Sequence, residues 1–480
     1  MDRIELAPGL EISRVLTGLW QVADMERGGS TLDAETASRA MDPYVDQGLT
    51  TFDMADHYGS SEVISGAFHA RRPGAAQLLT KWVPEPGPLT REDVRAAVDR
   101  ARSRMQTESL DLLQFHAWSY VHPGWMDAIF ALDELRREGL IRHLGLTNTD
   151  TAHLRMLLSS GVPIVSNQIC YSLLDQRARG AMSELCRARG VGILAFGTLA
   201  GGFLTDRWLG RVEPGIDDLE TWSQMKYFRF IQAAGGWDPF QALLETVRQV
   251  AERRGVSMAN VASRAILEAP AVAGVIIGAR LGRSQHIDDT LALSAFQLRA
   301  EDHAALDAAR ADLQPIPGDC GDEYRVPPFL TASGDLSHHL DSFPPPYPVH
   351  PGPGTRQRAL SGTVWEDLAG FSRATRIGDR ILVSGTTATH GDRLIGGQDA
   401  YAQAVFCLDK IQGAVESLGG TLADVVRTRV YIHDPEVWEG VSRAHGERFR
   451  DVQPANTLVH AGLVGEGYLV EIEAEAMVAS

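Results

Sequence analysis

The chain has 480 residues and a formal net charge of −17, with 44% hydrophobic and 22% charged residues. This length predicts two to four domains, and the composition is that of a globular protein that can bury a core. The acidic balance argues against nucleic acid and anionic membranes as partners, because both select basic patches. No apolar run approaches the ~20 residues that a membrane span needs.

The N-terminus and the cysteines bear on the compartment. The first ten residues include two acids and no apolar core, unlike a secretory signal peptide. The cysteines are scattered and show no metal-ligand spacing, which is typical of thiols in a reducing compartment. They are Cys170, Cys186, Cys320 and Cys407. We therefore expect a cytoplasmic protein with no metal site.

Short apolar segments alternate with helical patterns over the first two thirds of the chain. Eight segments have the composition of strands buried on both faces. They are Arg14–Trp20, Leu49–Met54, Gln77–Trp82, Leu110–His116, Arg142–Asn148, Pro163–Ile169, Gly190–Gly197 and Val272–Ala279. Helical patterns such as Arg91–Met105 and Trp125–Arg137 lie between them. The alternation predicts an α/β fold, a closed (β/α)8 or TIM barrel over residues 1–311. An open doubly wound sheet is the alternative, but no Gly-x-Gly-x-x-Gly follows the first strand.

Two stretches interrupt this alternation. The stretch Gly201–Pro239 follows the seventh strand and has no clear strand of its own, so we expect a lid or a disordered loop at the catalytic mouth. Residues 312–358 are dense in proline, which predicts a stiff, extended linker able to hold the barrel clear of the next domain. Its aromatic residues indicate packing along a surface. They are Tyr324, Phe329, Phe343 and Tyr347.

The last part of the chain, residues 359–480, has a different pattern. Its order ββαβαββ predicts a small α+β domain with helices on one face of a mixed sheet. The expected elements are strands Ser372–Ile377 and Arg380–Thr386, helix Asp399–Leu418, strand Val425–Ile432, helix Pro435–Arg450, and strands Thr457–Ala461 and Tyr468–Val478. The other sheet face has no helices to cover it. We expect that face to carry Ile381, Val383, Val426, Thr428 and Val430.

Polar residues close three barrel strands, at the end where active sites of such barrels lie. They are Asp53, Lys81 and His116, with Tyr58 just beyond the first. A phenol has a pKa near ~10, which a nearby ammonium lowers, and a carboxylate holds that ammonium in place. A histidine can orient a carbonyl oxygen near the phenol. Together these groups would protonate a carbonyl while a cofactor supplies hydride. A structural ion pair and ordinary strand-end residues are the alternatives for each residue taken singly.

Three segments in this region resemble the signature segments of aldo-keto reductases. They are Phe52–Gly59, Leu79–Lys81 and Leu112–His116. The resemblance extends from about residue 4 to residue 311. It implies that Tyr58 is the general acid and that Lys81 and Asp53 tune it. It also implies that His116 orients the substrate.

The same resemblance implies NADPH or NADP as cofactor. Residues expected at the nicotinamide end are Thr147, Asn148, Gln168, Phe196, Gly197, Thr198 and Leu199. Gly278 and Arg280 match the family's 2′-phosphate segment, and a guanidinium suits a phosphate dianion. A solvated surface charge is the alternative for Arg280. His286 and Asp289 stand near the family's adenosine contacts but depart from them in type.

Three tryptophans, Trp20, Trp82 and Trp118, follow or close strands near the same mouth. An aromatic wall of this kind suits an apolar or aromatic carbonyl substrate. Packing in the core is the alternative for each.

Residues 371–479 resemble the Rid (YjgF-like) family, whose fold is chorismate-mutase-like. The matching pieces are Ile381–Gly385, Asp424–Tyr431 and Leu469–Ala474. Members that hydrolyse imines use an arginine after a Pro-Ala pair, and here Asn456 takes that place. Glu471 matches a family site carboxylate, or is a solvated strand residue. The resemblance leaves a trimerisation module, or a site altered for another ligand.

The sequence therefore predicts a reductase of a small aldehyde, ketone or imine, joined to a domain that forms a homotrimer through its uncovered sheet face. A linker folded over that face, which keeps the chain monomeric, is the alternative. A cofactor-bound sensor without turnover is the second function, and the complete set of four polar residues argues against it. The acidic balance argues against a ribonuclease role for the C-terminal domain.

Overall fold

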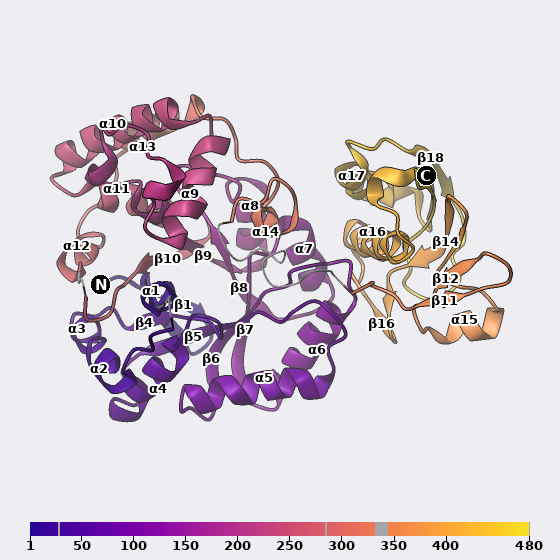
Figure 1. The fold of residues 1–480 in the computed structure, drawn as a ribbon, viewed down its shortest axis with the longest axis horizontal. Coiled ribbons are helices and arrows are strands. Elements are labelled where there is room, and N and C mark those ends of the chain that lie inside the picture. The colour runs from indigo at the N-terminus through magenta and orange to yellow at the C-terminus, as the bar shows by residue number, and fades with distance from the viewer. Residues whose placement is uncertain (27–28, 284–285, 332–343, 480) are drawn as a thin grey trace.

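The computed structural model describes residues 1–26, 29–283, 286–331 and 344–479. Eight parallel strands form a closed barrel in the order β10-β3-β4-β5-β6-β7-β8-β9 (Figure 1). They are β3 (Val15–Gly18), β4 (Thr51–Asp53), β5 (Gln77–Trp82), β6 (Leu110–Phe115), β7 (Ile141–Thr147), β8 (Ile164–Cys170), β9 (Gly192–Phe196) and β10 (Val272–Gly278). Each corresponds to one of the eight predicted segments, and the predicted (β/α)8 barrel is confirmed.

Helices surround the barrel, and their ends follow from local sequence signals. They are α1 (Trp20–Met25), α2 (Ala34–Arg39), α3 (Asp42–Asp46), α4 (Ser61–Arg71), α5 (Arg91–Arg104), α6 (Gly124–Arg137), α7 (Thr151–Ser159), α8 (Ala181–Arg189), α9 (Trp222–Ala233), α10 (Trp237–Arg254), α11 (Met258–Leu267), α12 (Ile287–Ala292) and α13 (Ala300–Ala311). A capping box of Thr90 and Asp93 begins α5. Gly255, at a φ of 66°, ends α10 in the left-handed conformation that glycine adopts without strain.

An antiparallel hairpin closes the N-terminal end of the barrel. It consists of β1 (Arg3–Ala7) and β2 (Leu10–Ser13), which the sequence argument did not predict. Its apolar side chains form one cluster with residues that point into the barrel. That cluster includes Leu6, Leu10, Ile12, Leu16, Leu79, Leu112 and Leu194. The opposite end, where the strands finish, is therefore left for the functional side chains.

The C-terminal domain contains a seven-stranded sheet in the order β11-β12-β13-β14-β19-β17-β18. Its elements are β11 (Val349–Pro351), β12 (Gln357–Ala359), α15 (Val364–Ala369), β13 (Ala374–Ile377), β14 (Arg380–Thr387), α16 (Ala400–Ser417), β17 (Val425–Ile432), α17 (Trp438–Phe449), β18 (Ala455–His460) and β19 (Val470–Met477). A small hairpin, β15 (Thr389–His390) and β16 (Arg393–Leu394), stands apart from this sheet. The predicted ββαβαββ order is present, and β11 and β12 extend the sheet from within the proline-rich stretch. Pro351 lies on the edge strand β11, where no ladder hydrogen bond is lost.

The prediction of which side chains line the uncovered sheet face is wrong. Ile381, Val383 and Val430 are buried in one core with α16, and Thr428 is buried and bonded to His445 of α17 at 2.8 Å. Of the predicted set, Val426 alone is exposed. Apolar alternation in a strand marks the face that another layer covers, so it indicated the helix side. Leu382 on β14 and Arg429 on β17 are more exposed than these neighbours, and Arg429 forms an ion pair with Glu473 of β19.

The two domains touch directly, so the proline-rich stretch does not hold them apart. Helix α16 packs along α7 of the barrel. Asp399 accepts a hydrogen bond from Arg155 Nε at 2.6 Å, and His390 contacts Asp127 at 2.7 Å. In Figure 1 helices α16 and α17 of the C-terminal domain lie on the side of its sheet that faces the barrel.

Of the predicted linker aromatics, Tyr347 is buried and its N–H donates to Ser417 of α16. Phe343 lies outside the described residues. Among the residues that are described, no helix is long and apolar enough to cross a bilayer. Nor is any group of three or more His, Cys, Asp or Glu side chains in those parts of the chain arranged so that it could hold a metal ion.

Candidate active site

Neighbouring barrel strands bring a buried ion pair to the mouth. Asp53 ends β4 and Lys81 lies near the end of β5, beside it in the barrel. Lys81 Nζ donates to both carboxylate oxygens of Asp53, at 2.8 and 2.7 Å, and to the carbonyl oxygen of Met54 at 2.9 Å. Both side chains are almost completely buried. All three ammonium N–H groups therefore have an acceptor, which holds the charge in one place.

Tyr58 lies directly beside this pair. The Lys81 ammonium is 4.8 Å from the centroid of the phenol ring, and the indole of Trp20 meets the ring edge-on at 4.9 Å. Burial, together with the carboxylate of Asp53, raises the pKa of Tyr58 well above its ordinary value. The sequence predicts that Lys81 lowers this pKa, but burial and the Asp53 carboxylate have the larger effect and raise it. The N–H groups of Lys81 are directed at Asp53 and Met54 instead of the phenol oxygen. Tyr58 thus keeps its proton until a strongly basic oxygen comes within reach.

His116 follows β6 and is held neutral. Burial lowers its pKa well below the ordinary value, and the positive charge of Arg325 acts in the same direction. Its Nε2 is buried and has no hydrogen-bond partner among the described residues. A buried polar atom without a hydrogen-bond partner costs about 1–3 kcal/mol of stability, so such atoms normally bond to protein, water or a ligand. A neutral imidazole with its proton on Nε2 can donate that hydrogen bond to a substrate oxygen.

Two glutamines are hydrogen-bonded to the carboxylate of this ion pair. Gln168 Nε2 donates to Asp53 Oδ1 at 2.7 Å and to Gln114 Oε1 at 2.9 Å, and Gln114 Nε2 donates to the same Asp53 oxygen at 3.1 Å. The structure thus places Gln168, expected at the cofactor, in a network that fixes Asp53. Gln114 was not singled out from the sequence, although it lies two residues before the motif histidine.

The turn after β7 offers a second unpaired polar atom. Thr147 Oγ1 and the N–H of Asn148 both donate to the carbonyl oxygen of Gln168, at 3.1 and 2.8 Å. Asn148 adopts a φ of 53°, a conformation that asparagine tolerates better than most residues. Its side-chain Oδ1 is buried with no partner among the described residues. An amide oxygen left in this state fits the NH2 group of a nicotinamide carboxamide.

Across the mouth, Phe196 ends β9 and remains partly exposed, so its ring is available for stacking. Gly197 follows with a φ of 76°, and a Cβ there would lie 2.1 Å from the hydroxyl oxygen of Tyr227. Only glycine fits this close approach. Thr198 is buried and hydrogen-bonded to Ser263 at 3.0 Å, and Leu199 is half-buried.

The end of β10 presents the expected phosphate segment. Gly278 ends the strand, and Arg280 is exposed two residues later. Its Nε donates to the neutral amide of Gln21 at 3.3 Å, and no carboxylate pairs with it in the described parts of the chain. A guanidinium in this state can receive an anion.

The two residues expected at the adenosine differ in their surroundings: His286 is exposed, whereas Asp289 is hydrogen-bonded within the protein. His286 is exposed at the N-terminus of α12. Asp289 accepts hydrogen bonds from Ser257 at 3.1 Å and from Asn260 at 3.0 Å, at the start of α11. Asp289 therefore joins two helices in this structure.

Two of the three tryptophans lie beside catalytic candidates. Trp20 contacts Tyr58, as described, and the ring of Trp118 is 4.5 Å from that of His116. Trp82 is buried and packs against Phe115 at 5.7 Å. The first two could form an aromatic wall around a substrate, while Trp82 supports the wall from the core.

Sequence reasoning missed the segment α14 (Asp322–Arg325), which lies across the mouth. Arg325 donates to the carbonyl oxygen of Asn148 at 2.6 Å and, through two of its nitrogens, to that of Ala117 at 3.0 and 2.6 Å. The ring of Tyr324 is 5.5 Å from that of His116. The aromatic residues of the proline-rich stretch did signal packing, but not the surface on which it occurs.

Helix α9, within the stretch predicted as a lid or loop, supplies a second missed residue. The ammonium of Lys226 donates to the hydroxyl of Tyr324 at 2.8 Å and lies 4.9 Å from the ring centroid of Phe196. A cation thus lies beside the rings of Phe196 and Tyr324 near the end of β9.

The matching position in the C-terminal domain is different in character. Asn456 donates to Thr428 Oγ1 at 3.0 Å, and Thr428 in turn is bonded to His445. Glu471 is half-buried, burial raises its pKa, and its carboxylate lies against Gly385. The amide in place of the arginine is therefore joined to its own sheet and helix.

Comparisons with known proteins agree with this arrangement. The model of the aldo/keto reductase family matches residues 14–311, and the model named Endoribonuclease L-PSP matches residues 365–478. Protein tas of Escherichia coli is 26% identical over 286 residues, covering 51% of this chain and 80% of that protein. An uncharacterized protein of Streptomyces coelicolor is 40% identical over 121 residues, covering 25% of this chain and 90% of that protein.

Among solved structures, a glycerol dehydrogenase from Gluconobacter oxydans matches with a TM-score of 0.55 and 24% identity. It covers 66% of this chain and 98% of that one, a likeness that shows the barrel fold alone. The family match extends over more than half of the sequence and contains all four polar residues of the mouth. The chain belongs to the aldo/keto reductase family and carries a YjgF-like domain after the barrel.

Proposed function

We propose that the barrel is an NADPH-dependent reductase of a small aldehyde, ketone or imine, with Tyr58 as general acid. The observation that carries this proposal is the pair of buried, unpaired polar atoms, His116 Nε2 and Asn148 Oδ1, at the ends of neighbouring strands. One suits a substrate oxygen and the other suits a nicotinamide carboxamide. Tyr58, still protonated, lies in the same mouth.

The residues of the mouth divide the work as follows. When bound, NADPH supplies the hydride. His116 donates from Nε2 to the carbonyl oxygen and holds it near Tyr58. As negative charge develops on that oxygen, it becomes a stronger base than the phenolate of Tyr58 and takes the proton of the phenol. Lys81, 4.8 Å from the ring and fixed by Asp53, stabilises the phenolate that is left.

The preference for NADPH over NADH rests on Arg280. Its guanidinium is exposed at the end of β10 and is bonded to a neutral amide, so a 2′-phosphate gains a charged partner there. The partly exposed ring of Phe196 supports stacking of a flat ring at the other end of the site, with the Lys226 ammonium 4.9 Å from its centroid.

The test begins with mass spectrometry of the nucleotide that copurifies with the full chain. A panel of aldehydes, ketones and cyclic imines then follows, with either NADPH or NADH as reductant. We expect oxidation of NADPH with at least one carbonyl or imine class. Tight NADPH binding without turnover over the whole panel would instead favour the sensor.

For the C-terminal domain we propose assembly into a homotrimer without hydrolysis of amino-acid-derived imines. Asn456 offers no guanidinium, and its amide is already bonded to Thr428. The barrel docks on the helix side, which leaves the open sheet face free for other copies. Sedimentation of the full chain tests this. A mass near one protomer of 52.2 kDa at micromolar concentration contradicts it.

A further inference from the structure

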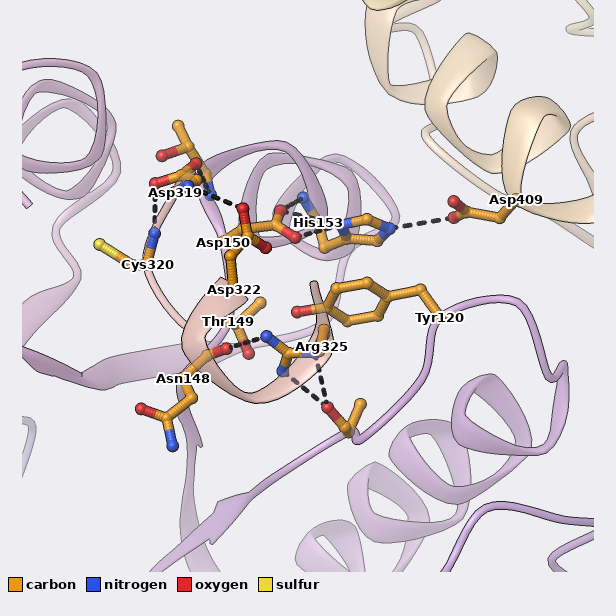
Figure 2. A network of polar contacts seen from close by, with 12 residues as sticks. Tyr120, Asn148, Thr149, Asp150, His153, Asp319, Cys320, Asp322, Arg325 and Asp409 are labelled. Carbon is orange, nitrogen blue, oxygen red and sulfur yellow. Dashed lines mark hydrogen bonds and ion pairs between the residues drawn. The ribbon is translucent and has the colours of Figure 1, made fainter. Parts of the chain in front are cut away.

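A chain of polar and charged side chains connects the C-terminal domain to the turn after β7, residues 147–150 (Figure 2). Asp409 of α16 is buried and bonded to His153 Nε2 of α7 at 3.0 Å. His153 Nδ1 lies 2.8 and 2.7 Å from the two carboxylate oxygens of Asp150. Asp150 caps the N-terminus of α7 and comes two residues after Asn148. One imidazole thus joins a carboxylate of each domain.

A second branch runs from the same histidine to the same turn. The ring of His153 stacks on that of Tyr120 at 3.5 Å, with 13° between their planes. The guanidinium of Arg325 lies 4.5 Å from the Tyr120 ring centroid and donates to the carbonyl oxygen of Asn148. Figure 2 shows the amide of Asn148 pointing away from this network. The network therefore holds the backbone of the turn while the side chain stays free for a ligand.

The charges around the imidazole keep this link closed. Asp150 and Asp409 raise the pKa of His153 to about 9 against the effect of burial, so it is a cation at neutral pH. Arg448 donates to Asp409 at 2.5 Å, which fixes that carboxylate from within its own domain. Three further charged groups near the turn come from the proline-rich stretch. They are Asp319, Asp322 and Arg325.

We propose that Asp409 and His153 are positioning residues for the turn that holds the cofactor, so that docking of the C-terminal domain sets the cofactor affinity of the barrel. The inference rests on the proposed NADPH site. The turn needs outside support, because Asn148 has a positive φ that costs energy in isolation. Removing the charge of Asp409 leaves His153 with one carboxylate and loosens the cap at Asp150.

The interface offers a matched control. Asp399, at the start of the same helix α16, pairs with Arg155 of the same helix α7. Asp399→Asn thus also removes one ion pair between the domains. Asparagine remains a good helix cap, and in the described parts of the chain no hydrogen bond or ion pair joins the Arg155 side chain to residues 147–150.

The experiment uses the full-length chain as wild type, Asp409→Asn and Asp399→Asn. NADPH affinity is measured by direct titration, and hydrogen exchange is measured over residues 147–151 in the free protein. We expect Asp409→Asn to weaken NADPH binding roughly 5-fold or more and to speed exchange at the turn. The KM for NADPH should rise, while kcat at saturating NADPH stays close to the wild-type value. Asp399→Asn should leave affinity and exchange near those of wild type.

Equal effects of the two substitutions overturn the inference, because they indicate a general loosening of the interface. Unchanged exchange at the turn in Asp409→Asn overturns it as well, whatever the affinity. If the wild type binds no NADPH, the proposed function fails and the exchange measurement alone decides the positioning role. Should Asp409→Asn not fold, His153→Gln breaks the same link from the barrel side, with the same expected results.

Discussion

In the barrel mouth, His116 Nε2 and Asn148 Oδ1 are buried without partners among the described residues. Around Asn456 in the C-terminal domain, by contrast, the amide, the hydroxyl of Thr428 and the imidazole of His445 are bonded to one another. Both regions are candidate sites in the sequence analysis. The comparison teaches that resemblance alone does not identify a working site. Buried polar groups without a protein partner identify a ligand site better, because leaving them unpaired lowers the stability of the fold.

The largest expected effect is the loss of turnover on substitution of Tyr58 in the barrel mouth. Tyr58→Phe removes the only hydroxyl that we place at the reacting oxygen, so turnover should fall roughly 10²- to 10⁴-fold. NADPH affinity should be nearly unchanged, because the ring and its contact with Trp20 remain. Steady-state kinetics and a binding titration on the same preparation check both statements. Turnover at the wild-type level would remove Tyr58 from the mechanism.

The barrel mouth could be predicted from sequence because each polar residue closes an apolar strand, and parallel strands end at the same side of a closed barrel. That reasoning placed Asp53, Lys81 and His116 correctly relative to one another. It could not find Arg325 or Lys226, which reach the mouth from α14 in the proline-rich stretch and from α9 in the stretch predicted as a lid or loop. Their partners are far away in sequence, and no periodicity encodes such contacts.

For the C-terminal domain, the order of elements was predictable and the orientation of the sheet was not. The apolar alternation of Ile381 and Val383 identified a covered face, but the sequence argument assigned it to the open side. The hairpin of β1 and β2 was also missed, because its short apolar runs precede the repeating pattern. The direct contact of α16 with α7 depends on charge pairs between distant segments.

The next effect concerns the junction of the two regions. The folded-state pKa of His153, about 9, lies above its ordinary value of 6.5, so its charge stabilises the folded chain. The contribution, of the order of 3 kcal/mol, is fully present below about pH 6.5 and is lost as pH rises through about 9. Free energies of unfolding should therefore differ between wild type and His153→Gln at about pH 6, and converge at about pH 10. An equal difference at both pH values contradicts this assignment.

Arg280→Ala tests whether the end of the barrel site near β10 binds the 2′-phosphate of NADPH. Loss of the charged partner should weaken NADPH roughly 10- to 100-fold and leave NADH almost unaffected. Titrations with both nucleotides measure this. Equal losses for the two would mean that Arg280 does not bind the 2′-phosphate, and its bond to Gln21 would then be its whole role.

The smallest expected effect lies in the C-terminal domain. Asn456→Ala removes one side-chain hydrogen bond on an exposed strand, so reductase turnover should change less than about 2-fold and stability by about 1 kcal/mol. Activity and thermal unfolding of the full chain test it. A loss comparable to that of Tyr58→Phe would show that the two regions act in one reaction and would break the comparison.

The central claim is that the barrel mouth transfers hydride from NADPH to a carbonyl or imine and that Tyr58 completes the reaction. It is tested most directly with NADPH that carries deuterium at the transferable position of its nicotinamide, incubated with the full chain and a reactive aldehyde. We predict that mass spectrometry finds one deuterium on the carbon of the product alcohol, and almost none with Tyr58→Phe. An aldehyde that returns unchanged from saturated enzyme, across every substrate class of the panel, would contradict the account.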